Sequence, residues 1–154
     1  MLKCDFDPNI TFSDNENMAN DEALRQVMQL GNDNGIEEKV KFSCKINLKG
    51  TTLNQYKKIN IAITNKKIYS MRKKNIKPII VVEDIIGFTI SKDIKNKHFI
   101  IHIKDSMDEL FYGEFIFEIL DVIKHVYFED NVSNLPVFEI AENSKIEKYA
   151  KTFD

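Results

Sequence analysis

Seven short segments with the character of β-strands follow one another between residues 41 and 113, and this succession limits the possible folds more than any other feature. Residues 41–48 show the pattern most clearly, because polar and apolar side chains alternate along them. A period of two places one set of side chains in a core and the other on a surface. Here the predicted core set is Phe42, Cys44, Ile46 and Leu48, and the predicted surface set is Lys41, Ser43, Lys45 and Asn47.

The other predicted strands are joined by links of hairpin length and cover residues 56–64, 67–72, 79–82, 85–91, 99–104 and 109–113. After them the hydrophobic period becomes helical. One face of this helix holds Ile116, Ile119, Leu120, Ile123, Val126 and Tyr127, and the opposite side holds Glu118, Asp121 and His125. The sequence therefore predicts an α+β fold that is mainly β, a seven-stranded antiparallel barrel capped by a C-terminal helix.

The two ends of the chain carry weaker patterns. Residues 1–20 are acidic and rich in turn-forming residues, and a short apolar stripe over 21–30 predicts a helix with Asn20 or Asp21 as its N-cap. Residues 135–140 are predicted to be extended, and 144–153 to add a last short helix. We expect three parts: an N-terminal acidic arm with its short helix (1–37), the main domain (38–142) and a C-terminal extension (143–154).

Charge is strongly segregated along the chain. Residues 39–82 hold 12 Lys and Arg and no Asp or Glu, whereas residues 1–38 hold nine acids against two bases and residues 83–154 hold 15 against eight. The formal net charge is only −2. Because a local patch sets the electric field that a partner meets at short range, the basic block predicts an anionic partner.

Enzymatic and metal chemistry find little support in the sequence. The five glycines form no phosphate-binding loop, and no Ser-His-Asp or Cys-His set can be placed on one rim. His98 and His102 lie on a predicted strand, where four residues separate them by roughly 13 Å, too far to share a zinc ion. Asp5, Asp7, Asn9, Ser13 and Glu16 have the spacing of a calcium loop, but Ile10 stands where that loop needs glycine. We expect no enzyme, no metal and no cofactor.

Cellular location is indicated by what the sequence lacks. No apolar run approaches the roughly 20 residues needed to span a bilayer. Without an apolar leader, Cys4 and Cys44 are expected to be free thiols in a reducing compartment, the cytoplasm. Of the two, Cys44 falls on the core face and is expected to serve packing.

Seven strands followed by a helix is the order of the pleckstrin-homology superfold, and several motifs allow a narrower comparison. The run VKFSCKINLKGTTLNQYKKINIAITNKKIYSM resembles the opening of a class I myosin tail homology domain, with Ile63–Tyr69 matching its Thr-Asn-Lys-containing strand segment. PIIVVEDIIGFTIS and HFIIHIKDSMDELFY resemble the strands that follow in that family. The resemblance extends over about residues 38–140, and the chain contains no motor domain.

The resemblance implies a pleckstrin-homology-like fold that binds anionic phospholipid, usually phosphoinositide, through basic residues of the first two strands and their loop. By position these are Lys45, Lys49, Lys57 and Lys58. We add Arg72, Lys73 and Lys74, at the next basic turn, to the candidate anion-binding residues. Neighbouring residues on a strand face opposite sides, so Lys57 and Lys58 are expected to diverge.

The sequence thus predicts a non-catalytic adaptor or scaffold that docks a basic face on an acidic surface. The first expectation is an acidic protein partner in a larger cytoskeletal assembly, and the alternative is a peripheral membrane tether that binds phosphoinositide. A third possibility left open is that the acidic arm lies over the basic face. Nucleic acid is not expected, because stacking on bases needs exposed rings beside the cations and only Tyr56 and Tyr69 are candidates.

Overall fold

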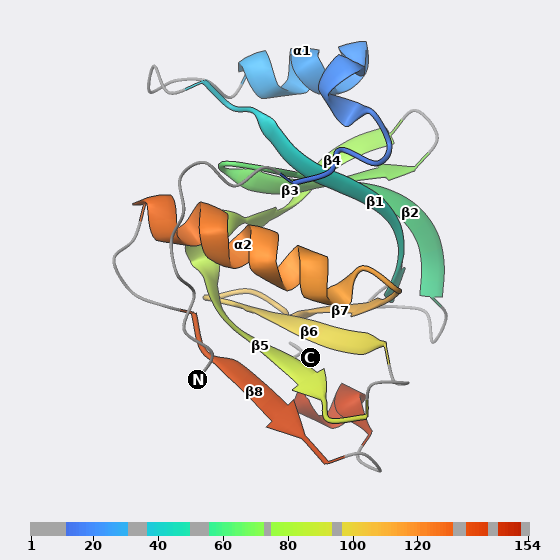
Figure 1. Ribbon diagram of the computed structural model, residues 1–154, viewed down its shortest axis with the longest axis vertical. Coiled ribbons are helices and arrows are strands. Elements are labelled where there is room, and N and C mark those ends of the chain that lie inside the picture. Colours follow the sequence, from blue (N-terminus) through green and yellow to red (C-terminus); the bar gives the residue numbers. More distant parts are fainter. Residues whose placement is uncertain are drawn as a thin grey trace.

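The computed structural model describes residues 12–30, 37–49, 56–72, 75–93, 97–130, 135–141 and 145–151 (Figure 1). A short 3₁₀-helix, η1 (Met18–Asn20), and α1 (Glu22–Leu30) precede the strands. The strands and the helices between and after them are β1 (Val40–Lys49), β2 (Tyr56–Thr64), β3 (Lys67–Arg72), β4 (Asn75–Val81), η2 (Val82–Asp84), β5 (Ile85–Ser91), β6 (His98–Ile103), β7 (Glu109–Tyr112), α2 (Ile116–Asp130), β8 (Val137–Ile140) and η3 (Ile146–Tyr149).

All strands belong to one curved sheet of eight strands in the order β4-β3-β2-β1-β7-β6-β5-β8. The predicted mainly-β fold with a helix after the strands is confirmed, but the seven-stranded antiparallel barrel needs correction, because an eighth strand is present and the sheet ends in two edges. β8 pairs in parallel with β5, whereas the other pairs are antiparallel. Gly87 permits this approach, since a Cβ atom there would lie 3.1 Å from the carbonyl oxygen of Pro136.

Most predicted strand boundaries agree with the structure to within a residue, and β4 is the exception. It begins at Asn75 rather than at Ile79, so Pro78 lies inside the strand. A proline in a strand is tolerated at a sheet edge or beside a bulge. Both conditions hold here, because β4 is an edge strand and the β3–β4 register shifts between Ile68 and Tyr69, next to Pro78.

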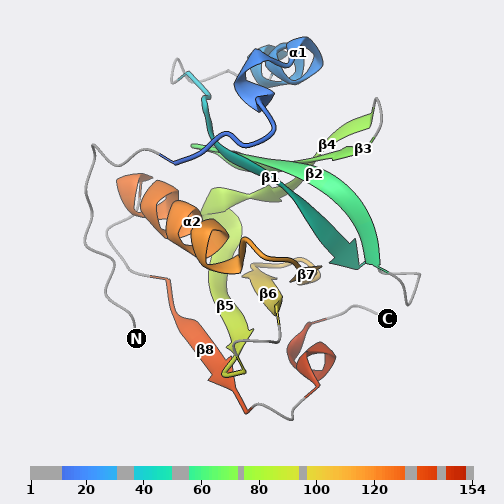
Figure 2. The same cartoon turned by 45° about the vertical axis from the view of Figure 1, so that its right-hand side comes forward.

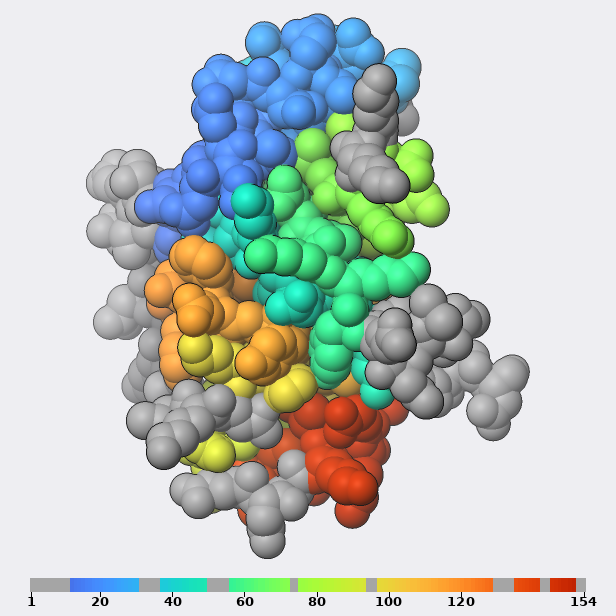
Figure 3. Space-filling model, turned by 90° about the vertical axis from the view of Figure 1, so that its right-hand side faces the viewer, coloured from blue at the N-terminus to red at the C-terminus, as the bar shows by residue number. Residues whose placement is uncertain are grey.

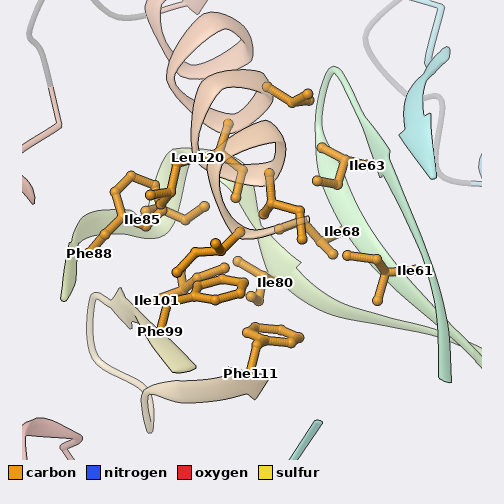
Figure 4. Close-up of a cluster of buried hydrophobic side chains, with 14 of the residues drawn as sticks. Ile61, Ile63, Ile68, Ile80, Ile85, Phe88, Phe99, Ile101, Phe111 and Leu120 are labelled. Carbon is orange, nitrogen blue, oxygen red and sulfur yellow. The ribbon is translucent and has the colours of Figure 1, made fainter. Parts of the chain in front are cut away.

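The main core lies on the concave face of the sheet, which α2 closes (Figure 4). Inward side chains of β1 and β2, such as Ile46 and Ile61, meet Leu120 and Ile123 of α2 in one buried cluster. Phe99 and Phe111 stack within it at 5.2 Å between ring centroids. Cys44 is fully buried there, as expected for a packing residue.

Residues 12–30 lie against the sheet and α2, and we call them the N-terminal cover. Its helix α1 and the core helix α2 lie on opposite sides of β1–β4 (Figures 1 and 2). Leu24 and Met28 of α1 pack on the outer, convex face against Ala62, Tyr69 and Met71. Asp21 caps α1, as predicted, by accepting a 2.9 Å hydrogen bond from the backbone N–H of Leu24.

The N-terminal cover also buries two residues that were predicted to face solvent. Ser43 is fully buried, and its hydroxyl donates to Asp14 while accepting from the backbone N–H of Glu16. On α2, His125 is 5% exposed because the ring of Phe12 packs edge-on against it at 5.6 Å. Both predictions were wrong because a polar residue on an outward position was read as solvated, whereas a distant segment covers it.

Residues 145–151 cover the convex face at the other end of the sheet, and we call them the C-terminal cover. Ile146 of η3 packs with Ile100, Leu110 and Ile140, and Tyr56 joins this cluster from β2. The backbone N–H of Lys151 donates to Asp108 at 2.7 Å, and the Lys151 ammonium donates to the carbonyl of Ile103 at 2.7 Å.

Candidate anion-binding site

Between the two covers, part of the convex face of β1 and β2 stays open, and its side chains are polar or basic. We call Lys45, Asn47, Lys58 and Asn60 the basic strip. The strand register brings them together, because Lys45 pairs with Asn60 and Asn47 pairs with Lys58. Figure 3 shows this region, with β1 and β2 in teal and green between the blue N-terminal cover above and the red C-terminal cover below.

Two shallow hollows flank the basic strip, and both are lined by Lys45 and Lys58. The first, of about 360 Å³, also takes its lining from Asn47, Lys97, Tyr112, Gly113, Glu114 and Phe115. The second, of about 430 Å³, is completed by Ile59, Asn60, Met71 and Arg72. We call them the Lys97 hollow and the Arg72 hollow. Their volumes fall in the range of about 300–1,000 Å³ typical of small-ligand sites.

The candidate residues named from the sequence separate into groups. Lys45, Lys58 and Arg72 come together around the hollows. Lys49 lies on the same strand face as Lys45 but pairs with Tyr56 and is half-buried. Lys57 is exposed and faces the opposite side from Lys58, as expected from their adjacency. Lys73 and Lys74 lie outside the described residues.

Only Lys45 and Lys58 of the residues lining the Lys97 hollow were predicted as site residues; among those that were not, Lys97, Tyr112 and Glu114 carry charged or aromatic polar side chains. They come from segments far from β1 in the sequence, and they reach it because β7 pairs with β1 through Asn47 and Tyr112. The Asn47 side-chain amide also donates to the Tyr112 carbonyl at 3.3 Å. The resemblance to the pleckstrin-type strand order was the one signal that could have placed Tyr112 here.

The Tyr112 ring is 38% exposed and is backed by two other rings. The centroid of His98 lies 4.6 Å from that of Tyr112 and 5.4 Å from that of Tyr56. Burial lowers the pKa of His98. The nearby charge of Glu147 partly offsets this lowering, and that of Lys49 adds to it. A lowered pKa favours the neutral form of the histidine beneath Tyr112, so the three rings form a wall of low charge beside the cations.

The cations of the basic strip are available to a ligand. Neither Lys45 nor Lys58 forms an ion pair with any residue that the structure describes, and both are exposed. Lys97 instead pairs with Glu114, with 3.1 Å between ammonium nitrogen and carboxylate oxygen. An anion entering the hollows would therefore meet two unpaired ammonium groups first.

A Thr-His-Asp arrangement, which the sequence did not predict, lies on the convex face near the C-terminal cover. The Thr89 hydroxyl is 2.6 Å from His102 Nε2, and His102 Nδ1 is 2.7 Å from Asp108. Thr89 is only 3% exposed, so a substrate has no access to its hydroxyl. Asp108 also accepts hydrogen bonds from the backbone of Ile103 and Lys151. The arrangement thus connects β5, β6 and the C-terminal cover.

Within the described part of the chain, no group of three or more His, Cys, Asp or Glu side chains is placed to hold a metal ion. None of the helices in the same residues has the length and apolar character needed to cross a bilayer.

Comparison with known proteins identifies the family. Residues 10–152 match the model of the unconventional myosin tail family, which is described as actin- and lipid-binding. The chain belongs to this family. The family match of this myosin tail domain includes both covers as well as the sheet, and no curated protein sequence matches the chain.

Solved structures resemble this myosin tail domain in fold alone. The hSac2 domain of the human phosphoinositide phosphatase Sac2 superposes with a TM-score of 0.55 at 12% identity, covering 86% of this chain and 95% of that chain. The Slm1 PH domain in complex with inositol 4-phosphate gives a TM-score of 0.41 at 13% identity, covering 56% of this chain and 92% of that chain. The expected resemblance to a myosin tail domain is confirmed by the family match.

Proposed function

We propose that this domain is a non-catalytic binding module that docks the basic strip onto anionic phospholipid at a membrane surface. The observation that carries the proposal is the pair of unpaired lysines, Lys45 and Lys58, shared by two hollows of headgroup size. The lipid-binding description of the family supports it.

The expected strength of binding follows from the charges that line the hollows. A cation close to an anionic membrane contributes about 1 kcal/mol. Lys45, Lys58 and Arg72 together would then contribute roughly 3 kcal/mol, enough for weak, reversible peripheral attachment, whereas the charge of Lys97 is offset by Glu114. Tyr112 adds an amphipathic ring, a side chain suited to the interface between headgroups and water.

Vesicle flotation tests the proposal with a matched pair of charge reversals. The double variant Lys45→Glu/Lys58→Glu should lose most binding to phosphoinositide vesicles. Its control, Lys92→Glu/Lys104→Glu, changes the charge equally at two exposed lysines that do not line either hollow. The proposal is supported if wild-type binding falls with added salt and if the control variant still binds while Lys45→Glu/Lys58→Glu does not. Equal losses of binding in the two variants contradict it.

An acidic protein surface in a cytoskeletal assembly is the second candidate, favoured by the actin-binding description of the family. The two hollows meet along Lys45 and Lys58, so the basic strip could also follow an extended acidic segment. In that case we expect the folded domain to bind no anionic vesicle and to co-sediment with actin filaments instead, with binding lost when Lys45 and Lys58 are changed to Glu. That result would favour the protein partner over the lipid.

A further inference from the structure

We propose that Glu114 weakens the preference of the basic strip for highly charged anions, so that each additional phosphate of a headgroup strengthens binding less than the cations alone would allow. This inference rests on the proposed function and names the residue that sets its selectivity. Glu114 would act by like-charge repulsion, which discriminates between ligands by penalising one of them.

The two hollows differ in their charge although they share Lys45 and Lys58. The Arg72 hollow is lined by three cations and, among the described residues, by no acid. The Lys97 hollow is also lined by three cations, but Glu114 stands among them. An anion that occupies the Lys97 hollow therefore meets a weaker positive field and one fixed source of repulsion.

The backbone holds Glu114 opposite Lys97. The N–H of Gly113 donates to the Lys97 carbonyl at 3.0 Å, which ties the segment before α2 to the start of β6. Gly113 also packs closely on β1, because a Cβ atom there would lie only 3.0 Å from Ile46 Cγ1. These contacts fix the backbone next to Glu114, and the 3.1 Å ion pair with Lys97 places its carboxylate at the rim of the hollow.

The ion pair itself opposes binding only weakly. The side chains of Lys97 and Glu114 are 38% and 81% exposed, and exposed pairs of this kind contribute about 0–1 kcal/mol. A ligand phosphate can therefore replace Glu114 on Lys97 at small cost. The repulsion that remains between Glu114 and the ligand grows in proportion to ligand charge, so it weighs most on highly phosphorylated headgroups.

The experiment compares two vesicle compositions, one with phosphatidylinositol monophosphate and one with bisphosphate, at equal lipid content. Glu114→Gln keeps the size of the side chain and removes its charge. We expect it to raise affinity about threefold for the monophosphate and about tenfold for the bisphosphate at low salt. The control Glu139→Gln removes an exposed charge on β8 that lines neither hollow and should change both affinities equally.

An unchanged bisphosphate-to-monophosphate ratio in Glu114→Gln overturns the inference, while the proposed function still stands if Lys45→Glu/Lys58→Glu abolishes binding. Titration with soluble inositol phosphates separates the headgroup from the membrane surface. The same shift in ratio with soluble ligands supports the inference, and a shift confined to vesicles contradicts it. If neither wild type nor Glu114→Gln binds any of these probes, both the proposed function and the inference fail.

Discussion

The N-terminal and C-terminal covers protect opposite ends of the same convex face, and they are attached in different ways. Alternate residues of β2 mark the boundaries: Tyr56 packs with the C-terminal cluster, Lys58 and Asn60 lie open, and Ala62 packs under α1. The proposed site is thus the part of the face that neither cover occupies.

Each cover lies beside a buried carboxylate, and the partners of the two acids differ. Glu38, beneath α1, accepts from the hydroxyls of Thr64 at 2.6 Å and Tyr69 at 2.9 Å, and burial, followed by this contact, raises the pKa of Tyr69. Asp108 bonds to His102 and to the backbone of Lys151 in the C-terminal cover itself. Glu38 thus bonds only to strands beneath the N-terminal cover, whereas Asp108 bonds directly to the C-terminal cover. Hydrogen bonds to Ser43 hold the N-terminal cover in addition to the apolar packing of α1.

The most disruptive test of this contrast is Asp108→Ala. Without the carboxylate of Asp108, the N–H groups of Ile103 and Lys151 and the ring of His102 lose their hydrogen-bond partner. We therefore expect the free energy of unfolding to fall by about 3–5 kcal/mol. Denaturant titration measures the loss, and hydrogen exchange should show the C-terminal cover opening first. Asp121→Ala, at an exposed position of α2, is the control. Uniform exchange across both covers would contradict a local role for Asp108.

Leu24→Ala is the matching test at the N-terminal cover. Leu24 is fully buried against the convex face, so truncation should cost about 2–4 kcal/mol. Leu30→Ala changes the same residue type in the same helix at a position 85% exposed, and should alter stability by less than about 0.5 kcal/mol. Neither variant should change vesicle binding, because α1 lines neither hollow. Stronger binding by Leu24→Ala would instead show that this cover restrains the site.

The features that could be predicted from the sequence are those that depend on local patterns, and the features that could not are those that depend on long-range contacts. The period of two placed β2 correctly because its alternation is local. Burial of Ser43 could not be predicted, since it depends on Asp14, which lies 29 residues away in the chain. The pairing of β8 with β5 and the approach of Lys97 and Glu114 to Lys45 are likewise long-range contacts, which no local pattern reports.

Two carboxyl groups, Glu109 and Asp14, should give opposite pH responses, and the response of Glu109, which follows Asp108 in the chain, is the larger. Burial and the neighbouring charge of Asp108 raise the pKa of Glu109 to about 7 from 4.5. A carboxyl with a raised pKa favours the folded state below its unfolded pKa, and this advantage is lost as pH rises through 7. Glu109→Gln should therefore be more stable than wild type by about 1–2 kcal/mol at pH 8 and equal to it near pH 4. Thermal unfolding at both pH values measures the difference, and a constant offset would contradict this assignment.

Asp14 gives the smaller response, at the N-terminal cover and at the other end of the pH scale. Burial alone would raise its pKa, but hydrogen bonds from Ser43, Ala19 and Met18 outweigh burial and lower the pKa below 3.8. The stabilisation is therefore present above 3.8 and is lost as pH falls through the lowered value. Because Asp14 is partly exposed, we expect Asp14→Asn to cost no more than about 1 kcal/mol at pH 7 and less at pH 3. Asn15 is a poor comparison because its side chain also bonds to β1, so Glu22→Gln on the exposed face of α1 is the control. A cost that stays the same at pH 3 would mean that the charge of Asp14 does not contribute and that its side chain acts through shape and hydrogen bonds alone. Glu109 would then be the source of the pH response that we predict here.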